Sequence, residues 1–179
     1  MTTALLVIDV QNSLCQGEWA AFDVEATVVN INAVAKRTRS AGGTVVFIQH
    51  EEEHDAMRFG SDGWSLYQGL DVSPLDLRVR KTACDSFFKT DLKAVLEEKR
   101  VDRVVICGMQ TEYCVDSTAR GALAHGLSVT VVADGHTTLD NGVLTAKQII
   151  AHHNATLANL GNFGPTIKVM PVAELRIDA

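Results

Sequence analysis

Prolines, cysteines and clustered basic residues are all scarce in this sequence. It contains three prolines and four cysteines among 179 residues. The cysteines form no Cys-x-x-Cys pair, which argues against a zinc site built on them. The formal net charge is −6 and lysine and arginine are not clustered, so neither nucleic acid nor an anionic membrane is expected as a partner.

Long apolar runs are lacking as well. No stretch approaches the length of a membrane span, and the first residues show neither the charged nor the long apolar region of a signal peptide. We therefore expect a cytoplasmic protein whose cysteines are free thiols. Because 46% of the residues are hydrophobic and 21% are charged, we expect one domain over residues 1–179 with a sizeable core.

Short apolar runs, typical of buried parallel strands, alternate with segments of helical periodicity. Strands are predicted at 4–10, 44–48, 78–82, 104–107, 128–133 and 166–170. Helices are predicted at 24–39, 91–98, 112–125 and 144–160. This alternation predicts the α/β class: a single doubly wound, Rossmann-like domain of three layers, with a six-stranded and mainly parallel sheet joined by right-handed crossovers.

The stretch from Val104 to Ala119 predicts a buried strand, a sharp turn and a new helix. Gly108 ends the strand, and Thr111 is a suitable N-cap for the helix. Cys114 then falls in the first helical turn, where unpaired backbone N–H groups favour a thiolate. We therefore expect a nucleophile with a pKa below the value of about 8.5 of a free cysteine. By itself, the stretch is equally consistent with a buried structural cysteine.

Two charged residues are predicted to lie near this cysteine. Asp9 stands near the carboxyl end of the first strand and Lys81 near that of the third, and such ends border the ligand crevice of an open α/β sheet. A lysine cation lowers a thiol pKa, and a carboxylate can accept the thiol proton and return it to a leaving group. Most lysines are solvated surface residues, so the catalytic interpretation depends on all three residues together.

Four segments carry a resemblance to a known family. They are LLVIDVQN at 5–12, RKTACDSFFKTDL at 80–92, CGMQTEYCVDSTARGA at 107–122 and VADGHTT at 132–138. In order and spacing, over nearly the whole chain, they are similar to the isochorismatase-like cysteine hydrolase superfamily. The resemblance implies that Asp9, Lys81 and Cys114 are the catalytic triad. It also implies a cis peptide bond between Met109 and Gln110, and an oxyanion hole formed by the N–H groups of Gln110 and Cys114.

The resemblance further implies an activity. Members of the superfamily include nicotinamidases and N-carbamoylsarcosine amidohydrolases, so we expect hydrolysis of a small carboxamide, ureide or carbamoyl C–N bond through a thioester on Cys114. True isochorismatases lack the nucleophilic cysteine, which argues against vinyl-ether hydrolysis here. No cofactor is expected. A homo-oligomer, a dimer or higher, is expected from the fold class, with apolar loop surface supplied by Trp64, Tyr67, Phe87 and Phe88.

The segment from Gln49 to Pro74 has no regular pattern. A loop of this length in a compact domain is usually functional or mobile, so we expect it to form the wall and lid of the substrate pocket. An irregular surface excursion held by Trp64 is the alternative. The residues expected to line the pocket are Gln11, Leu14, Trp64 and Tyr113. Cys15, Cys84 and Cys107 are interpreted as structural thiols.

The region after the second strand departs from the nicotinamidases of the superfamily, which carry an Asp-x-His followed by further histidines. Here the sequence is His50-Glu51-Glu52-Glu53-His54. These side chains could bind a divalent ion, but the spacing is not the metal motif of the family, and an acidic solvated loop is favoured. We therefore predict no metal, and nicotinamide is not favoured as the substrate.

Two other functions fit parts of the sequence. One is a catalytically idle member of the same fold that serves as a scaffold or binding protein, which the retention of Asp9, Lys81 and Cys114 disfavours. The other is a nucleotide-binding module of the flavodoxin or Rossmann type. That module requires a glycine-rich phosphate loop after the first strand, whereas this chain has Asp9-Val10-Gln11-Asn12.

Overall fold

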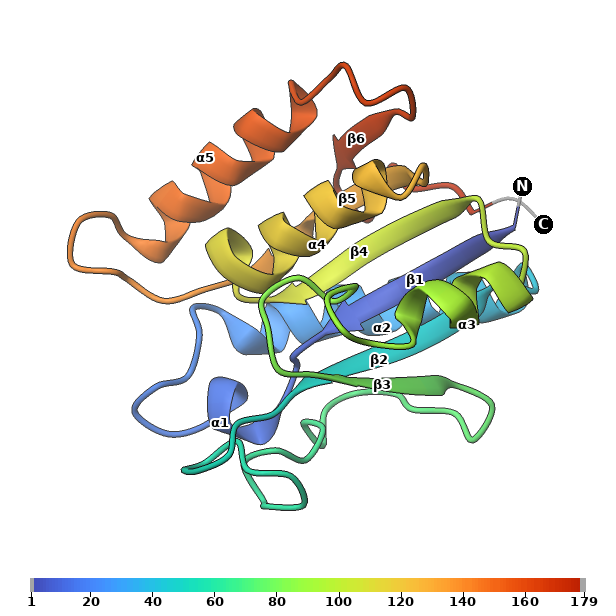
Figure 1. Ribbon diagram of the computed structural model, residues 1–179. Helices are drawn as coiled ribbons and strands as arrows, with labels where there is room; N and C mark the ends of the chain where they lie inside the picture. Colours follow the sequence, from blue (N-terminus) through green and yellow to red (C-terminus); the bar gives the residue numbers. More distant parts are fainter. Residues whose placement is uncertain (1, 178–179) are drawn as a thin grey trace.

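Six parallel strands form one sheet in the computed structural model, which describes residues 2–177. The strands are β1 (Thr3–Ile8), β2 (Thr44–His50), β3 (Leu77–Lys81), β4 (Arg103–Met109), β5 (Ser128–Thr137) and β6 (Ile167–Met170). Their order across the sheet is β3-β2-β1-β4-β5-β6, and every neighbouring pair is parallel (Figure 1). The predicted fold class is confirmed, with a sheet that is parallel at every pairing.

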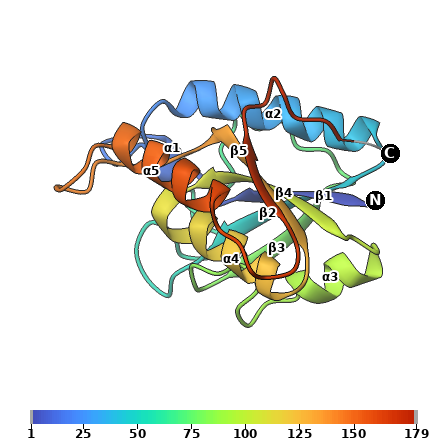
Figure 2. The same ribbon diagram turned by 90° about the horizontal axis from the view of Figure 1, so that it is seen from above.

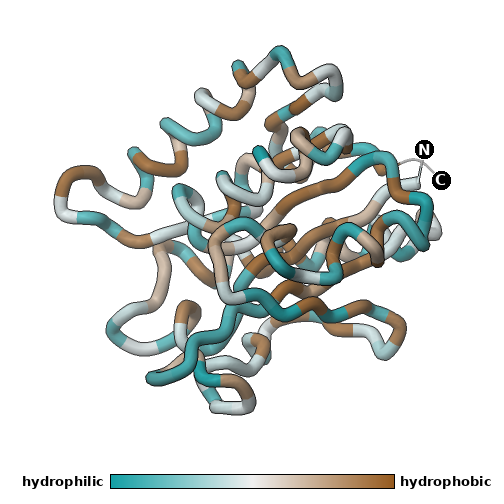
Figure 3. The backbone as a smooth tube through the Cα atoms, in the orientation of Figure 1, coloured by the Kyte–Doolittle hydropathy of each residue, from teal (hydrophilic) through white to brown (hydrophobic). Residues whose placement is uncertain are grey.

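Helices cover both faces of this sheet (Figure 2). The long helix α2 (Val24–Ser40) packs on one face, and α3 (Leu92–Glu98), α4 (Asp116–Ala124) and α5 (Ala146–Ala158) lie on the other. Alternate residues of β1 pack in the two core clusters on opposite faces of the sheet, because successive side chains of a strand point to opposite faces. Leu5 and Val7 join the cluster beneath α2, whereas Leu6 and Ile8 join the cluster beneath α3 and α4. The central strands β1, β2 and β4 are accordingly rich in hydrophobic residues (Figure 3).

Three local features differ from the prediction. The four-residue helix α1 (Asn12–Cys15) was not predicted, because four residues are too few to show a helical period. Strand β5 runs on to Thr137, past a register shift against β4 that lets it continue beyond Asp134 and Gly135. The helix after β4 begins as a π-helical turn, η1 (Thr111–Val115), before α4.

None of the helices within residues 2–177 is both long and apolar enough to cross a membrane.

The order of the strands places a crevice between β1 and β4. From β1 the chain builds β2 and β3 on one side, and later β4, β5 and β6 on the other, so the topology reverses at this point. Gly108 lies against Ile8 here, with a φ of +125°. A Cβ at Gly108 would lie 2.1 Å from the carbonyl oxygen of Ile8, so only glycine fits where the two strands approach.

Candidate active site

Asp9, Lys81 and Cys114 lie together at this crevice. The Lys81 Nζ is 2.7 Å from the Asp9 Oδ2 and 3.1 Å from the Cys114 Sγ. Asp9 directly follows β1, Lys81 is the last residue of β3, and Cys114 lies in the turn after β4. The exposed fractions of these residues are 1%, 2% and 9%. The structure therefore brings the three predicted residues to one buried point.

Lys81 is the centre of this arrangement. Its ammonium group also donates to the carbonyl oxygen of Ala83 at 3.1 Å and lies 3.3 Å from the Nδ1 of His50. Burial disfavours the charge on Lys81, but its neighbours, first among them the carboxylate of Asp9, outweigh burial and raise the pKa of Lys81 above its ordinary value. Lys81 is thus a fixed cation whose three N–H groups are fully engaged by neighbouring atoms.

The pKa of Cys114 is raised, contrary to the prediction. Burial is the largest cause, the negative charge of Asp9 adds to it, and the opposing effect of Lys81 is smaller. The prediction was wrong because it considered the helix terminus and the charge of Lys81, whereas burial of the side chain and the carboxylate of Asp9 outweigh them. The thiol therefore keeps its proton at neutral pH and needs a base. Within residues 2–177, the buried Asp9 Oδ1 has no hydrogen-bond partner.

The turn that carries Cys114 is built around Gln110. This residue is extended, and its carbonyl oxygen accepts hydrogen bonds from the N–H groups of Tyr113 and Val115 at 3.1 and 3.2 Å. The peptide bond between Met109 and Gln110 is cis, as the family resemblance implies. Thr111 does not cap the helix as predicted. It lies inside the first turn, and its buried hydroxyl faces the Nδ1 of His136 at 2.9 Å.

A cavity of about 300 Å³ opens onto the nucleophile. Its lining residues are Asp9, Leu14, His50, Glu52, Met57, Cys84, Gln110, Tyr113 and Cys114. Two of the four predicted pocket residues, Leu14 and Tyr113, are therefore in this lining. Cys84 is exposed and is not the buried structural thiol that was expected. Cys15 and Cys107 are buried.

Gln11 does not line the cavity, contrary to the prediction. Its side chain is fully buried, and its Nε2 donates to the carbonyl oxygens of His50 and Trp64 at 3.0 and 2.8 Å. Its Oε1 accepts from the N–H of His50 at 2.8 Å. Gln11 therefore fastens the segment after β2 to the end of β1, because all of these bonds go to backbone groups.

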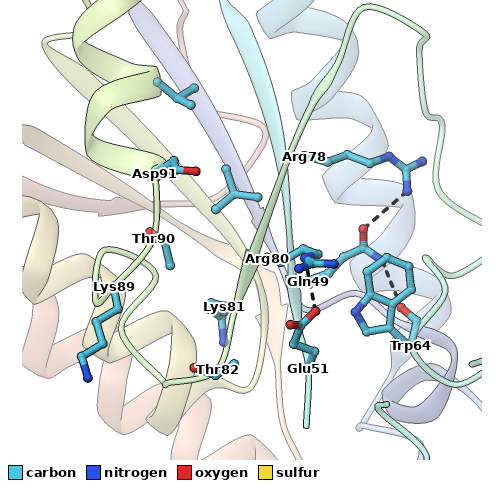
Figure 4. A pocket seen from close by; sticks show the side chains of 12 residues that line it. Gln49, Glu51, Trp64, Arg78, Arg80, Lys81, Thr82, Lys89, Thr90 and Asp91 are labelled. Carbon is cyan, nitrogen blue, oxygen red and sulfur yellow. Dashed lines mark hydrogen bonds and ion pairs between the residues drawn. The ribbon is translucent and has the colours of Figure 1, made fainter. Parts of the chain in front are cut away.

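Trp64, contrary to the prediction, does not line the cavity onto which Cys114 opens but lines a different one. This cavity of about 580 Å³ lies beside β3 (Figure 4). Its lining includes Arg78 and Arg80, which contact Gln49 and Glu51 in the figure, and it lacks Cys114. The larger cavity is therefore not the candidate active site, because the nucleophile opens onto the smaller one.

The segment from His50 to His54 does not gather into a metal site. In the part of the chain that the structure describes, residues 2–177, no group of three His, Cys, Asp or Glu side chains is placed to hold a metal ion. His50 turns towards Lys81, whereas the side chains of Glu53 and His54 are almost fully exposed. Burial, followed by the nearby charge of Lys81, lowers the pKa of His50. His50 is therefore a neutral residue in the lining of the cavity, a role that was not predicted from the sequence.

A buried chain of hydrogen bonds behind the turn was missed as well. The Nδ1 of His136 faces the Thr111 hydroxyl, and its Nε2 lies 2.9 Å from the Oδ1 of Asn154. The amide nitrogen of Asn154 donates to the carbonyl oxygen of Ala133 at 3.0 Å. His136 belongs to the quoted VADGHTT segment, but no periodicity marks it as a partner of Thr111, which is 25 residues away.

Comparison with known proteins identifies the family to which the chain is similar. The family model of the Isochorismatase domain matches residues 3–163. The uncharacterized isochorismatase family protein YddQ of Bacillus subtilis (strain 168) is 31% identical over 94% of this chain and 96% of that protein. A streptothricin hydrolase of Streptomyces noursei is 36% identical over 76% of this chain and 55% of that enzyme. A ureidoacrylate amidohydrolase of Caulobacter vibrioides is 26% identical over 74% of this chain and 76% of that enzyme.

The fold is shared with solved structures. A crystal structure of an isochorismatase family protein superposes with a TM-score of 0.85 at 36% identity, over 93% of this chain and 96% of that one.

Proposed function

This chain belongs to the isochorismatase family of hydrolases, and from that membership we propose that it is a cysteine-dependent hydrolase of a small carboxamide, ureide or carbamoyl C–N bond. The observation that carries the proposal is the contact of one buried ammonium group, that of Lys81, with both Asp9 and Cys114. The amidohydrolase among the relatives supports the choice of a C–N bond.

In the first half of the proposed reaction, the Cys114 sulfur attacks the carbonyl carbon of the substrate. The thiol proton passes to Asp9, whose Oδ1 has no other partner among residues 2–177. Lys81 stays charged and offsets the negative charge that the transfer moves from carboxylate to sulfur. The N–H groups of Gln110 and Cys114 are proposed to stabilise the oxyanion that forms on the carbonyl oxygen.

In the second half, Asp9 returns its proton to the leaving nitrogen. The C–N bond breaks, the amine departs and an acyl thioester remains on Cys114. A water molecule then attacks the thioester with Asp9 again accepting its proton, and the carboxylic or carbamic acid leaves as the Cys114 sulfur is reprotonated. The raised pKa of Cys114 fits this sequence, because a thiol that keeps its proton at rest requires a base within reach.

The alternative is a catalytically idle scaffold. A buried lysine and a buried carboxylate are costly to retain in an apolar site, and breaking such a pair is strongly destabilising. A scaffold could keep the pair of Asp9 and Lys81 for stability alone, but it has no need for a thiol that opens onto a cavity.

The test is a screen of primary amides, ureides and carbamoyl compounds for release of ammonia. We expect turnover that falls by a factor on the order of 10⁴ or more in Cys114→Ala, with an unchanged unfolding midpoint. The control is Cys15→Ala, which removes a buried thiol outside the cavity and should keep the activity. Turnover that survives in Cys114→Ala, or none in any compound of the screen, contradicts the proposal.

A further inference from the structure

We infer that the substrate carries no carboxylate and presents a cationic or N–H-rich group to Glu52, which the geometry assigns as a specificity-determining residue. The inference rests on the proposed function, because it concerns the same cavity. Two observations carry it: the charges in the lining of the cavity, and the position of Glu52 among them.

The lining of the cavity contains two carboxylates and no positively charged side chain among the described residues. Lys81 is not part of this lining but of that of the larger cavity, its side chain is fully buried, and its N–H groups are directed at Asp9, Cys114, Ala83 and His50. Its charge is therefore offset by Asp9 and is not open to a ligand. His50 is neutral, since burial lowers its pKa. The cavity thus keeps one uncompensated negative charge, on Glu52.

Glu52 is held at the cavity by its backbone. Its N–H donates to the carbonyl oxygen of Met57 at 3.1 Å, and it forms an isolated parallel β-bridge with Arg58. Across residues 2–177, the only basic group within 4.0 Å of its carboxylate is the ring of His50, at 3.6 Å, and because this ring is neutral the contact is not an ion pair. The Glu52 side chain is 52% exposed, whereas that of the adjacent Glu53 is 95% exposed and lies outside the lining.

These charges decide which substrates are accepted. A carboxylate on the substrate would meet Asp9 and Glu52 without a free cation to pair with, and like charges in a partly desolvated cavity repel. A cationic or N–H-rich group can instead pair with Glu52. Because the side chain of Glu52 is half-exposed, the expected discrimination is modest, roughly fivefold between opposite charges.

The first experiment measures the charge preference of the cavity with alkylating reagents, so the substrate need not be known. The full-length protein is alkylated with iodoacetamide, iodoacetate and 2-bromoethylamine, which are neutral, anionic and cationic. Each rate at Cys114 is followed by peptide mass spectrometry and divided by the rate of the same reagent with N-acetylcysteinamide. A Cys84→Ser background is used throughout, because Cys84 is exposed and lines the same cavity.

We expect the normalised rate of 2-bromoethylamine to exceed that of iodoacetate by roughly fivefold, and Glu52→Gln to remove most of this difference. The matched control, Glu53→Gln, removes the same charge one residue away and should preserve it. A faster normalised rate for iodoacetate, or equal effects of the two substitutions, overturns the inference. Failure of all three reagents to label Cys114, when they do label the unfolded chain, overturns the proposed function and this inference with it.

The second experiment uses three amides of similar length: 4-aminobutanamide, pentanamide and succinamate. We expect kcat/KM to fall in that order, and Glu52→Gln to raise KM for 4-aminobutanamide while leaving KM for pentanamide unchanged. If succinamate is the best of the three, the charge inference is wrong and the hydrolase proposal stands. If neither these amides nor any compound of the wider screen is hydrolysed although alkylation shows the cationic preference, the charge preference of the cavity stands and the hydrolase proposal is wrong.

Discussion

Asp9 is the residue on which the chemistry of the cavity depends most. It adopts the left-handed conformation, with φ of 52°, which is uncommon outside glycine but tolerated by aspartate. Residues held in this region cluster at functional sites, where the surrounding structure compensates the strain. Its carboxylate contacts Lys81 and raises the pKa of Cys114. Asp9 thus adds to the effect of burial in keeping the Cys114 thiol protonated at rest, and it is also the group placed to take the thiol proton.

The substitution Asp9→Asn should therefore raise the rate at which Cys114 is alkylated and lower the rate of turnover. Loss of the negative charge leaves Lys81 as the main charge beside Cys114, so the pKa of Cys114 falls and alkylation by iodoacetamide at pH 7.5 becomes faster. Turnover should fall by about 10²–10⁴-fold, because the base is lost. In the unsubstituted protein, the alkylation rate should keep rising as pH passes about 8.5, since the thiolate forms above that value.

The measurement is the pH dependence of Cys114 labelling, followed by mass spectrometry, beside steady-state turnover. Asp91→Asn, at the start of α3 and outside the lining of the cavity that contains Cys114, is the control and should change neither. Slower labelling of Cys114 in Asp9→Asn would show that the carboxylate does not hold the thiol proton in place.

At the scale of elements, η1, β5 and α5 are joined through His136. Because the amide nitrogen of Asn154 donates to Ala133, its oxygen faces the Nε2 of His136, which therefore carries the hydrogen. The Nδ1 then accepts from the Thr111 hydroxyl. Burial lowers the pKa of His136, which keeps the ring neutral and preserves this direction of the hydrogen bonds. The chain holds the first residue of the turn that carries Cys114.

Replacement of Thr111 by valine tests this connection between elements. It preserves the shape of the side chain but leaves the buried Nδ1 of His136 without a donor, so we expect a loss of about 1–3 kcal/mol in the free energy of unfolding. Because the turn is then less firmly held, kcat should fall roughly tenfold with little change in KM. Urea denaturation and steady-state kinetics measure the two effects.

The control is Thr156→Val. Thr156 also faces a histidine, His152, but this pair is exposed and its members are 3.4 Å apart. The substitution should change stability by less than about 0.5 kcal/mol and leave kcat unaltered. Equal effects of the two substitutions, or a change in KM alone in Thr111→Val, would contradict a positioning role for the buried pair.

At the scale of the whole molecule, the apolar surface differs from the one predicted for self-association. Tyr67 and Phe87 are buried in the two core clusters, so neither offers an interface. Phe88 remains half-exposed. Four of the exposed apolar side chains lie on two loops that a hydrogen bond between Phe22 and Thr138 connects: Trp19 and Phe22 on one, Val143 and Leu144 on the other. We propose that a second copy of the chain packs on this surface.

We therefore expect light scattering to give a dimer or a higher oligomer rather than the monomer mass of 19.4 kDa. Trp19 is 71% exposed, so Trp19→Gln should weaken the assembly without loss of stability. Leu75→Gln, which changes an even more exposed apolar residue on the loop before β3, should leave it intact. A monomer at working concentration rejects the proposal, and an assembly that Leu75→Gln dissociates moves the interface elsewhere.

The sequence by itself determined the class of the fold and where its chemistry stands. Strand and helix periods are local patterns, so the six strands and four main helices could be predicted to within a few residues, apart from the longer β5. In a parallel sheet the carboxyl ends of all strands lie at one edge. Asp9, Lys81 and Cys114 could therefore be placed at that edge from their positions along the chain.

The tertiary structure alone decided what surrounds these residues. The pKa of Cys114 depends on its burial and its distance from Asp9, and neither is encoded in a local pattern. Gln11 and Trp64 were predicted to line the substrate pocket because they follow or lie between strands. The Gln11 side chain is instead hydrogen-bonded to backbone groups, and Trp64 lines a second cavity. Which side chains share a cavity is fixed by how a loop without periodicity packs, because those contacts join residues far apart in the chain.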